Sequence, residues 1–345
     1  MYSVGIDAHD RLYALCILDE GGKVVKEKTI TGGAGEVAEF LRRLDGPARV
    51  CYEASLGYGT LYDALSPAAA QVQVAHPAHL RAIFRSKRKN DRLDARKLAV
   101  ALHLDQVPRV HVPTLEVREW RGLIEHRRRL VDKRTAAKNA LRALLRSQGV
   151  QAPRGAKLWF GRGRAWLRSF SLLSPLTTLR RDQLLAELER LGETIDAAES
   201  MLDRIGDKHP GVQLLRTIPG VGPRTAEAVM AYVDDPNRFG RSSRAGSYFG
   251  LVPSLDESAG VKRYGHITRQ GPATVRKLLA EAAWQVIRYS PSMRALFERV
   301  KGGKKDRTGI ALVAVAHRLA RVMVAMLKSK EPWRKEQRKG VNDAA

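Results

Sequence analysis

The chain has 345 residues, 44% of them hydrophobic, which allows two or three domains with buried cores and excludes a disordered protein. Lysine and arginine total 61 against 36 aspartate and glutamate residues, a formal net charge of +25 with a pI near 10.5. An excess of positive charge of this size attracts polyanions, so nucleic acid is the expected partner.

Cysteine usage and hydropathy indicate the compartment. Cys16 and Cys51 lie in apolar, strand-like runs without metal-ligand spacing, which is typical of buried free thiols in a reducing environment. The start MYSVGID lacks the basic and apolar regions of a secretory signal. The apolar stretch Gly309–Leu327 is interrupted by a histidine and two arginines, so no membrane span is expected. We expect a cytoplasmic protein of bacterial type.

Residues 1–110 are predicted to form an α/β domain. The expected strands are Val4–Ile6, Leu12–Leu18, Lys23–Ile30, Ala48–Tyr52 and Gln71–Ala75. The expected helices are Gly35–Leu44, one beginning with Thr60–Ala64 and one opened by Pro77. Three antiparallel strands followed by helices alternating with parallel strands is the ribonuclease H-like (RuvC-like) pattern, although several doubly wound folds share it.

Residues 111–206 are predicted to form a long helical coiled-coil region, with helices over 115–149 and Asp182–Ile205. Apolar residues of the second helix recur in steps of four and three, as in a heptad seam: Leu184, Leu188, Leu191, Ile195, Ala198, Leu202 and Ile205. The seam fits either a hairpin of two helices within one chain or a dimerisation coil. The Gly- and Arg-rich stretch Gln151–Leu173 between them is expected to be a loop.

Residues 207–330 are predicted to form a mainly α-helical domain, followed by a polar tail over 331–345. Ile218-Pro219-Gly220-Val221-Gly222 precedes a predicted helix over Thr225–Val233, which indicates a helix-hairpin-helix. Backbone N–H groups at Gly220 and Gly222 could then hold a phosphate at the helix N-terminus. A plain turn between helices is the alternative.

Four carboxylates of the first domain are candidate metal ligands. Asp7 lies in a strand among apolar neighbours, where a charge is costly unless it is paired or binds a cation. Glu53 closes a strand, where α/β sheets place ligand-binding groups. Asp91 and Asp94 have the spacing that puts both on one helix face. Oxygen ligands suit Mg²⁺ or Mn²⁺, and two such ions on the order of 4 Å apart assist phosphodiester chemistry.

The three aspartates also have simpler interpretations. Asp7 could be a turn or capping residue, Asp91 could cap a helix, and Asp94 could pair with Arg96 or Lys97. The combination of four carboxylates on a basic chain favours the metal site. A neighbouring basic run fits phosphate contacts; its residues are Arg85, Lys87, Arg88 and Lys89.

The polar stretch Ser254–Gly265 is expected to be a loop. A serine there could attack phosphorus, because nearby cations stabilise a developing alkoxide and the phosphorane charge. On chemistry alone Ser254 and Ser258 are equal candidates. The cations that follow are Lys262, Arg263 and Arg269, which are predicted to contact nucleic acid.

These residues match a known family. The chain resembles the transposases of insertion sequences that have a DEDD-type, RuvC-like N-terminal domain and a C-terminal transposase domain, and that are guided by a noncoding bridge RNA. The matching motifs occur in the family's order over about residues 1–330. They are Gly5-Ile6-Asp7, Tyr52-Glu53-Ala54 through Gly57-Tyr58-Gly59, Lys89–Arg96, Ile218–Gly222, Phe249–Pro253 and Gly265–Gly271.

The resemblance implies that Asp7, Glu53, Asp91 and Asp94 form the catalytic, metal-binding tetrad. It implies that Ser258, rather than Ser254, is a nucleophile that becomes joined to DNA. The family usually has glycine after this serine, where the present chain has alanine at 259, and a shift by one residue would place glutamate 257 there. The implied partners are the DNA of element ends and target, a guide RNA and further copies of the chain in a dimer or tetramer with a composite site.

Other functions remain open at this point. A junction-resolvase-like nuclease would cut structured DNA by metal-dependent hydrolysis without a covalent intermediate. A non-catalytic basic protein would bind nucleic acid and be indifferent to Asp7→Asn. A sugar kinase of the actin-like fold is disfavoured, because Ala8-His9-Asp10-Arg11 stands where those enzymes have a phosphate-binding loop.

Overall fold

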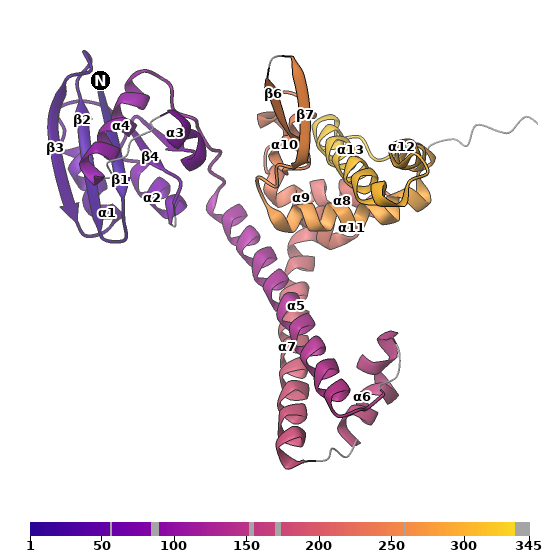
Figure 1. Cartoon of the computed structure of the whole chain (residues 1–345). Coiled ribbons are helices and arrows are strands. Elements are labelled where there is room, and N and C mark those ends of the chain that lie inside the picture. The colour runs from indigo at the N-terminus through magenta and orange to yellow at the C-terminus, as the bar shows by residue number, and fades with distance from the viewer. Residues whose placement is uncertain (56, 84–89, 152–154, 170–173, 259, 335–345) are drawn as a thin grey trace, which may run out of the picture. The chain divides into compact units, whose positions relative to one another are not determined.

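The computed structural model describes residues 1–55, 57–83, 90–151, 155–169, 174–258 and 260–334. The chain forms two compact units, Met1–Arg118 and Glu119–Ala345 (Figure 1). The domain boundaries predicted near residues 110, 206 and 330 stay predictions.

The first unit contains a five-stranded mixed sheet in the order β3-β2-β1-β4-β5. Its strands are β1 (Tyr2–Ala8), β2 (Leu12–Leu18), β3 (Val24–Thr31), β4 (Ala48–Glu53) and β5 (Gln71–Ala75). The first three strands are antiparallel, whereas β4 pairs parallel to β1 and β5 parallel to β4. The predicted strands are confirmed with their ends moved by up to two residues, and the topology is compatible with a ribonuclease H-like domain.

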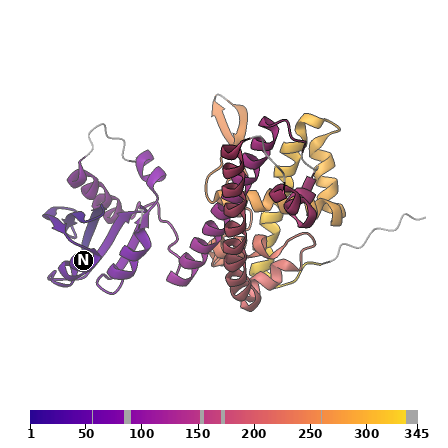
Figure 2. The same ribbon diagram turned by 90° about the horizontal axis from the view of Figure 1, so that it is seen from below.

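Helices cover both faces of this sheet (Figure 2). They are α1 (Ala34–Arg42), α2 (Tyr58–Leu65), α3 (Pro77–Ile83) and α4 (Asp91–His103). Buried residues of α1 and α2, such as Val37 and Leu65, share one cluster with Ile6 of β1. On the opposite face, Ala99 of α4 packs with Cys16 of β2. Successive side chains along β1 and β2 point to opposite faces of the sheet, so a buried core forms on each side.

Gly5 determines how closely α4 approaches the sheet. A Cβ at this position would overlap the carbonyl oxygen of Ala95 and the backbone nitrogen of Ala99. Both alanines are fully buried, and their small side chains let the helix backbone lie directly on β1. Gly5 therefore brings the first turn of α4 toward the strand end that carries Asp7.

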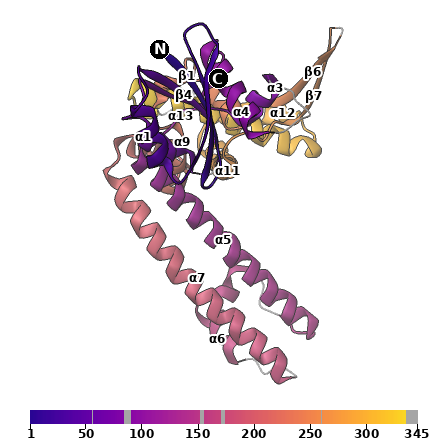
Figure 3. The ribbon, with the colours of Figure 1, turned by 90° about the vertical axis from the view of Figure 1, so that its left-hand side faces the viewer.

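The second unit contains two long antiparallel helices, α5 and α7 (Figure 3). Helix α5 (Leu115–Ser147) begins just before the unit boundary, and α7 covers Pro175–Lys208. Leu130 of α5 packs with Leu191 and Ile195 of the predicted seam, and Arg127 forms an ion pair with Glu199. The seam thus serves contacts within the chain, and its use in dimerisation stays a prediction.

The loop predicted over Gln151–Leu173 is wrong in its described part. The structure has a short 3-10 helix, η1 (Gly155–Trp159), and a helix, α6 (Gly161–Ser169). Leu158 and Leu167 are buried in one cluster with leucines of α5. The prediction was based on the Gly- and Arg-rich composition and did not take these two leucines into account. Their burial outweighs the low helix propensity of glycine.

Further helices and a two-stranded sheet complete the second unit. The elements are α8 (Pro210–Arg216), α9 (Pro223–Val233), η2 (Pro236–Arg238), α10 (Arg244–Tyr248), β6 (Pro253–Ser258), β7 (Val261–Ile267), α11 (Ala273–Tyr289), α12 (Pro291–Lys301), η3 (Lys305–Arg307) and α13 (Thr308–Ser329). By length and composition, Lys305–Ser329 could cross a membrane. However, Val315, Leu319 and Met323 are fully buried in the core of this unit, which accounts for the apolar composition.

The loop predicted over Ser254–Gly265 is also wrong. Strands β6 and β7 pair there as an antiparallel hairpin that extends away from the helices of its unit (Figures 1 and 3). Every residue of β6 is exposed, so no buried face produces the alternation that marks a strand in a sequence. Gly260 adopts a φ of 80° in the connecting turn, a conformation that favours glycine.

Glu227 is an unusual feature of the helical core. This residue of α9 is only 1% exposed, and within the described residues neither carboxylate oxygen has a hydrogen-bond partner. The Nη1 atom of Arg224 lies 3.3 Å from Glu227 Oε2, which is close enough for an ion pair. Burial nevertheless raises the pKa of Glu227 to about 7, because the effect of Arg224 is smaller.

We expect Gly5→Ala to destabilise the first unit by about 1–3 kcal/mol, because the added methyl group must displace helix backbone rather than a flexible side chain. The midpoint of urea unfolding measures this. Gly35→Ala in α1 is the matched control, since its Cβ would meet nothing within 4 Å. The control should be unchanged or slightly more stable. Equal stability of Gly5→Ala and the wild type would contradict the close packing.

We expect Glu227→Gln to raise the unfolding temperature at high pH only. Because the folded-state pKa of Glu227 lies above its unfolded value, the wild type loses stability as the pH rises from 4.5 to about 7. The variant should match the wild type at about pH 4 and exceed it at about pH 9. Glu281→Gln, at an exposed position of α11, should show no such divergence in the same thermal scans. A constant difference at all pH values would refute the assignment.

Candidate metal centre and nucleophile

Asp7 is the centre of the carboxylate group. It lies in β1 opposite Ala14 of β2, and its side chain is 19% exposed. Burial raises the pKa of Asp7; His9 lowers it, and the negative charges of Asp91, Asp94 and Glu53 raise it further. All four predicted metal ligands therefore lie close enough to interact electrostatically.

The three other carboxylates come from two neighbouring elements. Glu53 is the last residue of β4 and is half-buried. Asp91 and Asp94 lie in the first turn of α4, whose N-cap is Asn90, so the interpretation of Asp91 as a capping residue is wrong. Asp94 does pair with Lys97, whose Nζ lies 2.6 Å from Asp94 Oδ1.

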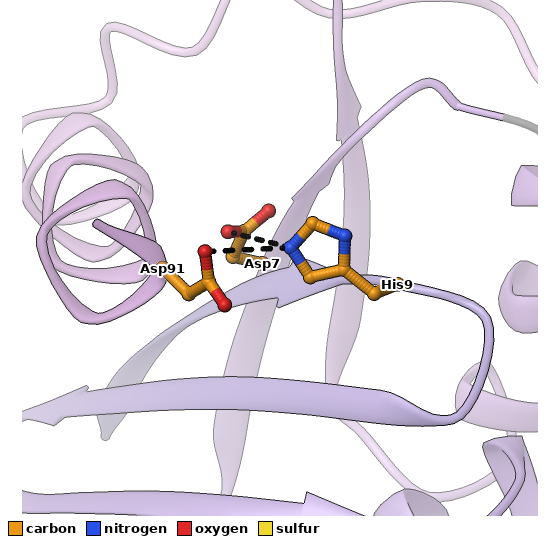
Figure 4. A group of neighbouring side chains, drawn as sticks. All are labelled: Asp7, His9 and Asp91. Atoms are coloured by element: carbon orange, nitrogen blue, oxygen red, sulfur yellow. Dashed lines mark ion pairs between the residues drawn. The ribbon is translucent and has the colours of Figure 1, made fainter. Parts of the chain in front are cut away.

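His9 belongs to this group and was missed by the sequence analysis. Its Nε2 atom lies 3.4 Å from Asp7 Oδ2 and 3.5 Å from Asp91 Oδ1 (Figure 4). One ligand atom from each of the three residues lies within 4.8 Å of the others. His9 follows Asp7 by two residues, the spacing that puts side chains of extended chain on one side, and this was the available signal.

The donor set fits a divalent cation. Carboxylate oxygens dominate it, as Mg²⁺ and Mn²⁺ prefer, and an imidazole nitrogen is tolerated by transition metals. The repulsion that raises the pKa of Asp7 is also the interaction that a bound cation would remove. Asp7, His9 and Asp91 could therefore hold an ion, whereas participation of Glu53 and Asp94 stays a prediction.

The hairpin distinguishes the two candidate serines. The Ser254 hydroxyl donates a hydrogen bond to the carbonyl oxygen of His266 at 3.1 Å and packs against Gly265. Ser258 ends β6 beside the turn, where it pairs with Val261 of β7, and it is exposed; its hydroxyl has no hydrogen-bond partner within the described part of the chain. The hydroxyl of Ser258 is therefore available, and that of Ser254 is engaged.

The other predicted contact residues that the structure describes lie in the second unit. Lys262 and Arg263 are exposed on β7, where the Nζ atom of Lys262 lies 3.8 Å from the neighbouring carboxylate at 257. Gly220 adopts a φ of 93° and packs on the backbone of α11, whereas Gly222 is the exposed N-cap of α9. Arg269 is exposed at a φ of 54°. The basic run at 85–89 and the alanine at 259 lie outside the described residues.

The chain is similar to known transposases over nearly its whole length. Residues 4–148 match a transposase family of the DEDD type, and residues 212–298 match the Transposase IS116/IS110/IS902 family. The transposase for insertion sequence element IS1111A of Coxiella burnetii is 29% identical over 96% of this chain and 91% of that protein. A probable family 20 transposase of Pseudomonas aeruginosa is 26% identical, with 96% and 98% covered. The transposase for insertion sequence element IS1328 of Yersinia enterocolitica is 25% identical, with 92% and 94% covered.

We expect Asp7→Asn to uncouple stability from divalent metal. Without metal the variant should unfold at the wild-type temperature or above it, because one buried negative charge is removed from the group. With saturating Mn²⁺ the wild type should gain stability by linkage and the variant should gain much less. Thermal scans with and without Mn²⁺ measure both effects. Asp10→Asn, exposed three residues further on, should keep the full response; a full response in Asp7→Asn would show that the metal binds elsewhere.

Proposed function

Because the chain belongs to the IS110/IS116 family of insertion-sequence transposases, we propose that it cuts and rejoins DNA by attack of the Ser258 hydroxyl on a phosphodiester. The observation that carries the proposal is the convergence of Asp7, His9 and Asp91 from two different elements into one group of metal-binding atoms. The available hydroxyl of Ser258 supports the choice of nucleophile.

The carboxylates Asp7, Glu53, Asp91 and Asp94 would hold Mg²⁺ or Mn²⁺ in this enzyme. A bound divalent ion would neutralise the phosphate and polarise its oxygen. The protein's own contribution is to hold Asp91 and Asp94 near Asp7 before DNA binds, through the packing of α4 on Gly5. His9 lies against Asp7 and Asp91 and would orient both carboxylates.

In the proposed reaction, the Ser258 Oγ atom forms a bond to phosphorus as the bond from phosphorus to one sugar oxygen breaks. The hydroxyl proton passes to solvent or a nearby base, and the leaving sugar oxygen takes up a proton. The products are a serine–DNA ester and a free hydroxyl end. Attack on this ester by the hydroxyl end of another strand restores the serine and joins the DNA. Lys262 and Arg263, exposed on the paired strand, would stabilise the negative charge at phosphorus.

Two further features of the proposal concern partners. A noncoding bridge RNA would supply the sequence match, which fits a net charge of +25 and a sequence without a recognisable base-reading motif. A dimer or tetramer would bring element ends and target DNA together. Large apolar side chains exposed on α7 support contact with a second copy; they are Leu176, Leu179 and Met201.

The test is a covalent protein–DNA adduct that survives denaturation. The wild-type chain, purified with its RNA and incubated with element DNA, target DNA and Mg²⁺, should form the adduct. Ser258→Ala should abolish it and slow strand cleavage on the order of 1000-fold or more. Ser254→Ala is the matched control and should retain it, because the Ser254 hydroxyl bonds the backbone. Ribonuclease treatment beforehand should also prevent adduct formation if RNA guides the reaction.

The remaining functions give different results. Metal-dependent cleavage that persists in Ser258→Ala, with no adduct in the wild type, would indicate the junction-resolvase-like nuclease. DNA binding without any cleavage, unaffected by Asp7→Asn, would indicate a non-catalytic nucleic-acid-binding protein.

A further inference from the structure

A large cleft lies within the second unit, between the base of the β6–β7 hairpin, α12 and α13. Its volume is about 1320 Å³. Pockets for small molecules have volumes of roughly 300–1,000 Å³. The cleft is therefore large enough for a segment of a polymer, and it is separate from the exposed hydroxyl at the end of β6.

The charged lining of the cleft is almost entirely cationic. Four arginines line it, Arg269, Arg299, Arg318 and Arg321, against a single acidic residue, Asp306, within the described chain. None of the four arginines has an ion-pair partner among the residues that the structure describes. The Nε atom of Arg321 is buried and has no hydrogen-bond partner there. Unpaired guanidinium groups at one cleft indicate an anionic occupant with several acceptor oxygens.

Most of the remaining lining is apolar and includes an exposed aromatic ring, beside the polar side chains of His266, Ser292 and His317. Tyr264 is 69% exposed and Ile310 is 60% exposed, above a floor that includes the buried Leu251 and Met293. A small anion such as free phosphate would leave this apolar and aromatic surface without contacts. Cationic grooves with aromatic side chains on which bases stack are typical of proteins that bind single-stranded nucleic acid.

Close backbone packing fixes the walls of the cleft. The backbone nitrogen of Arg269 donates to the carbonyl oxygen of Gly250 at 3.2 Å, and a Cβ on Gly250 would overlap the backbone of Gln270. The ring of His317 lies against Gly246, where a Cβ would also overlap it. Two glycines thus hold the hairpin base and α13 in place, so the cleft exists before a ligand binds.

We propose that this cleft binds unpaired nucleotides of a polynucleotide strand, with phosphates on the arginines and one base stacked on Tyr264. The proposal rests on the proposed function in taking nucleic acid as the substrate class, and it assigns a binding site to that substrate. DNA and RNA strands share the required chemistry, so the experiment has an arm for each.

The experiment uses the full chain and short fluorescent oligonucleotides: oligothymidylate, oligouridylate and a DNA duplex. Tyr264→Ala should weaken single-strand binding roughly tenfold, whereas Tyr264→Phe should keep it, because stacking needs the ring and not the hydroxyl. Tyr289→Ala is the matched control, since Tyr289 is 62% exposed and lies outside the cleft. Duplex binding should change little in all three variants. The oligonucleotide that the wild type binds more tightly, oligothymidylate or oligouridylate, identifies DNA or RNA as the natural strand.

Two readouts locate the binding. Arg318→Ala should lower the slope of log affinity against log salt by about 0.7, the contribution of one phosphate on a single strand. Arg204→Ala, at an exposed position of α7 outside the cleft, should not reproduce this loss. Photocrosslinking of oligonucleotides that carry bromouracil should label peptides that contain Tyr264 or the cleft-lining part of α13.

Several outcomes would overturn the proposal. One is equal affinity of Tyr264→Ala and Tyr289→Ala together with crosslinks outside the cleft. Another is a change in oligomeric state caused by Tyr264→Ala without any change in affinity, which would assign the cleft to a second copy of the chain. If the wild-type chain binds oligonucleotides through Tyr264 but forms no covalent adduct with DNA, only the proposed function is refuted.

Discussion

The contact between Gly5 and the backbone of α4 is the constraint on which the candidate metal centre depends. Strand β1 carries Asp7, and α4 carries Asp91 and Asp94 in its first turn. Any side chain at position 5 would overlap the helix backbone, and the buried Ala95 and Ala99 extend the same close fit. The site is thus built on two packed regular elements, which hold ligands more precisely than loops do.

The same packing creates an electrostatic cost. Carboxylates from β1, β4 and α4 repel one another, and burial adds to the rise in the pKa of Asp7. Within the described residues, only His9 and Lys97 form ion pairs with members of this group. A chain with a net charge of +25 would otherwise have ample cations for the purpose. The protein therefore keeps a concentrated negative site that a divalent ion can stabilise.

Some elements were predictable and others were not, for identifiable reasons. Strands β1, β2, β4 and β5 show alternating or continuous apolar runs, so their positions follow from the sequence. The β6–β7 hairpin has no buried face, and its polar residues were interpreted as a loop. Helix α6 is rich in glycine and arginine, and only its burial against α5 reveals it. The place of His9 in the carboxylate group was not predicted, because its partners lie on another element and in the preceding strand.

The sequence by itself determined the charge of the chain, the identity of the four carboxylates, the spacing that puts Asp91 and Asp94 on one helix face, and the sheet that holds Asp7 and Glu53. Only the tertiary structure decided that α4 approaches Asp7, that His9 lies between two carboxylates, and that the Ser254 hydroxyl is engaged while that of Ser258 is available. The physical reason is the distance along the chain over which each kind of signal acts. Periodicity and charge act along neighbouring residues, whereas contacts between elements depend on how closely two backbones pack, which here depends on the missing side chain of Gly5.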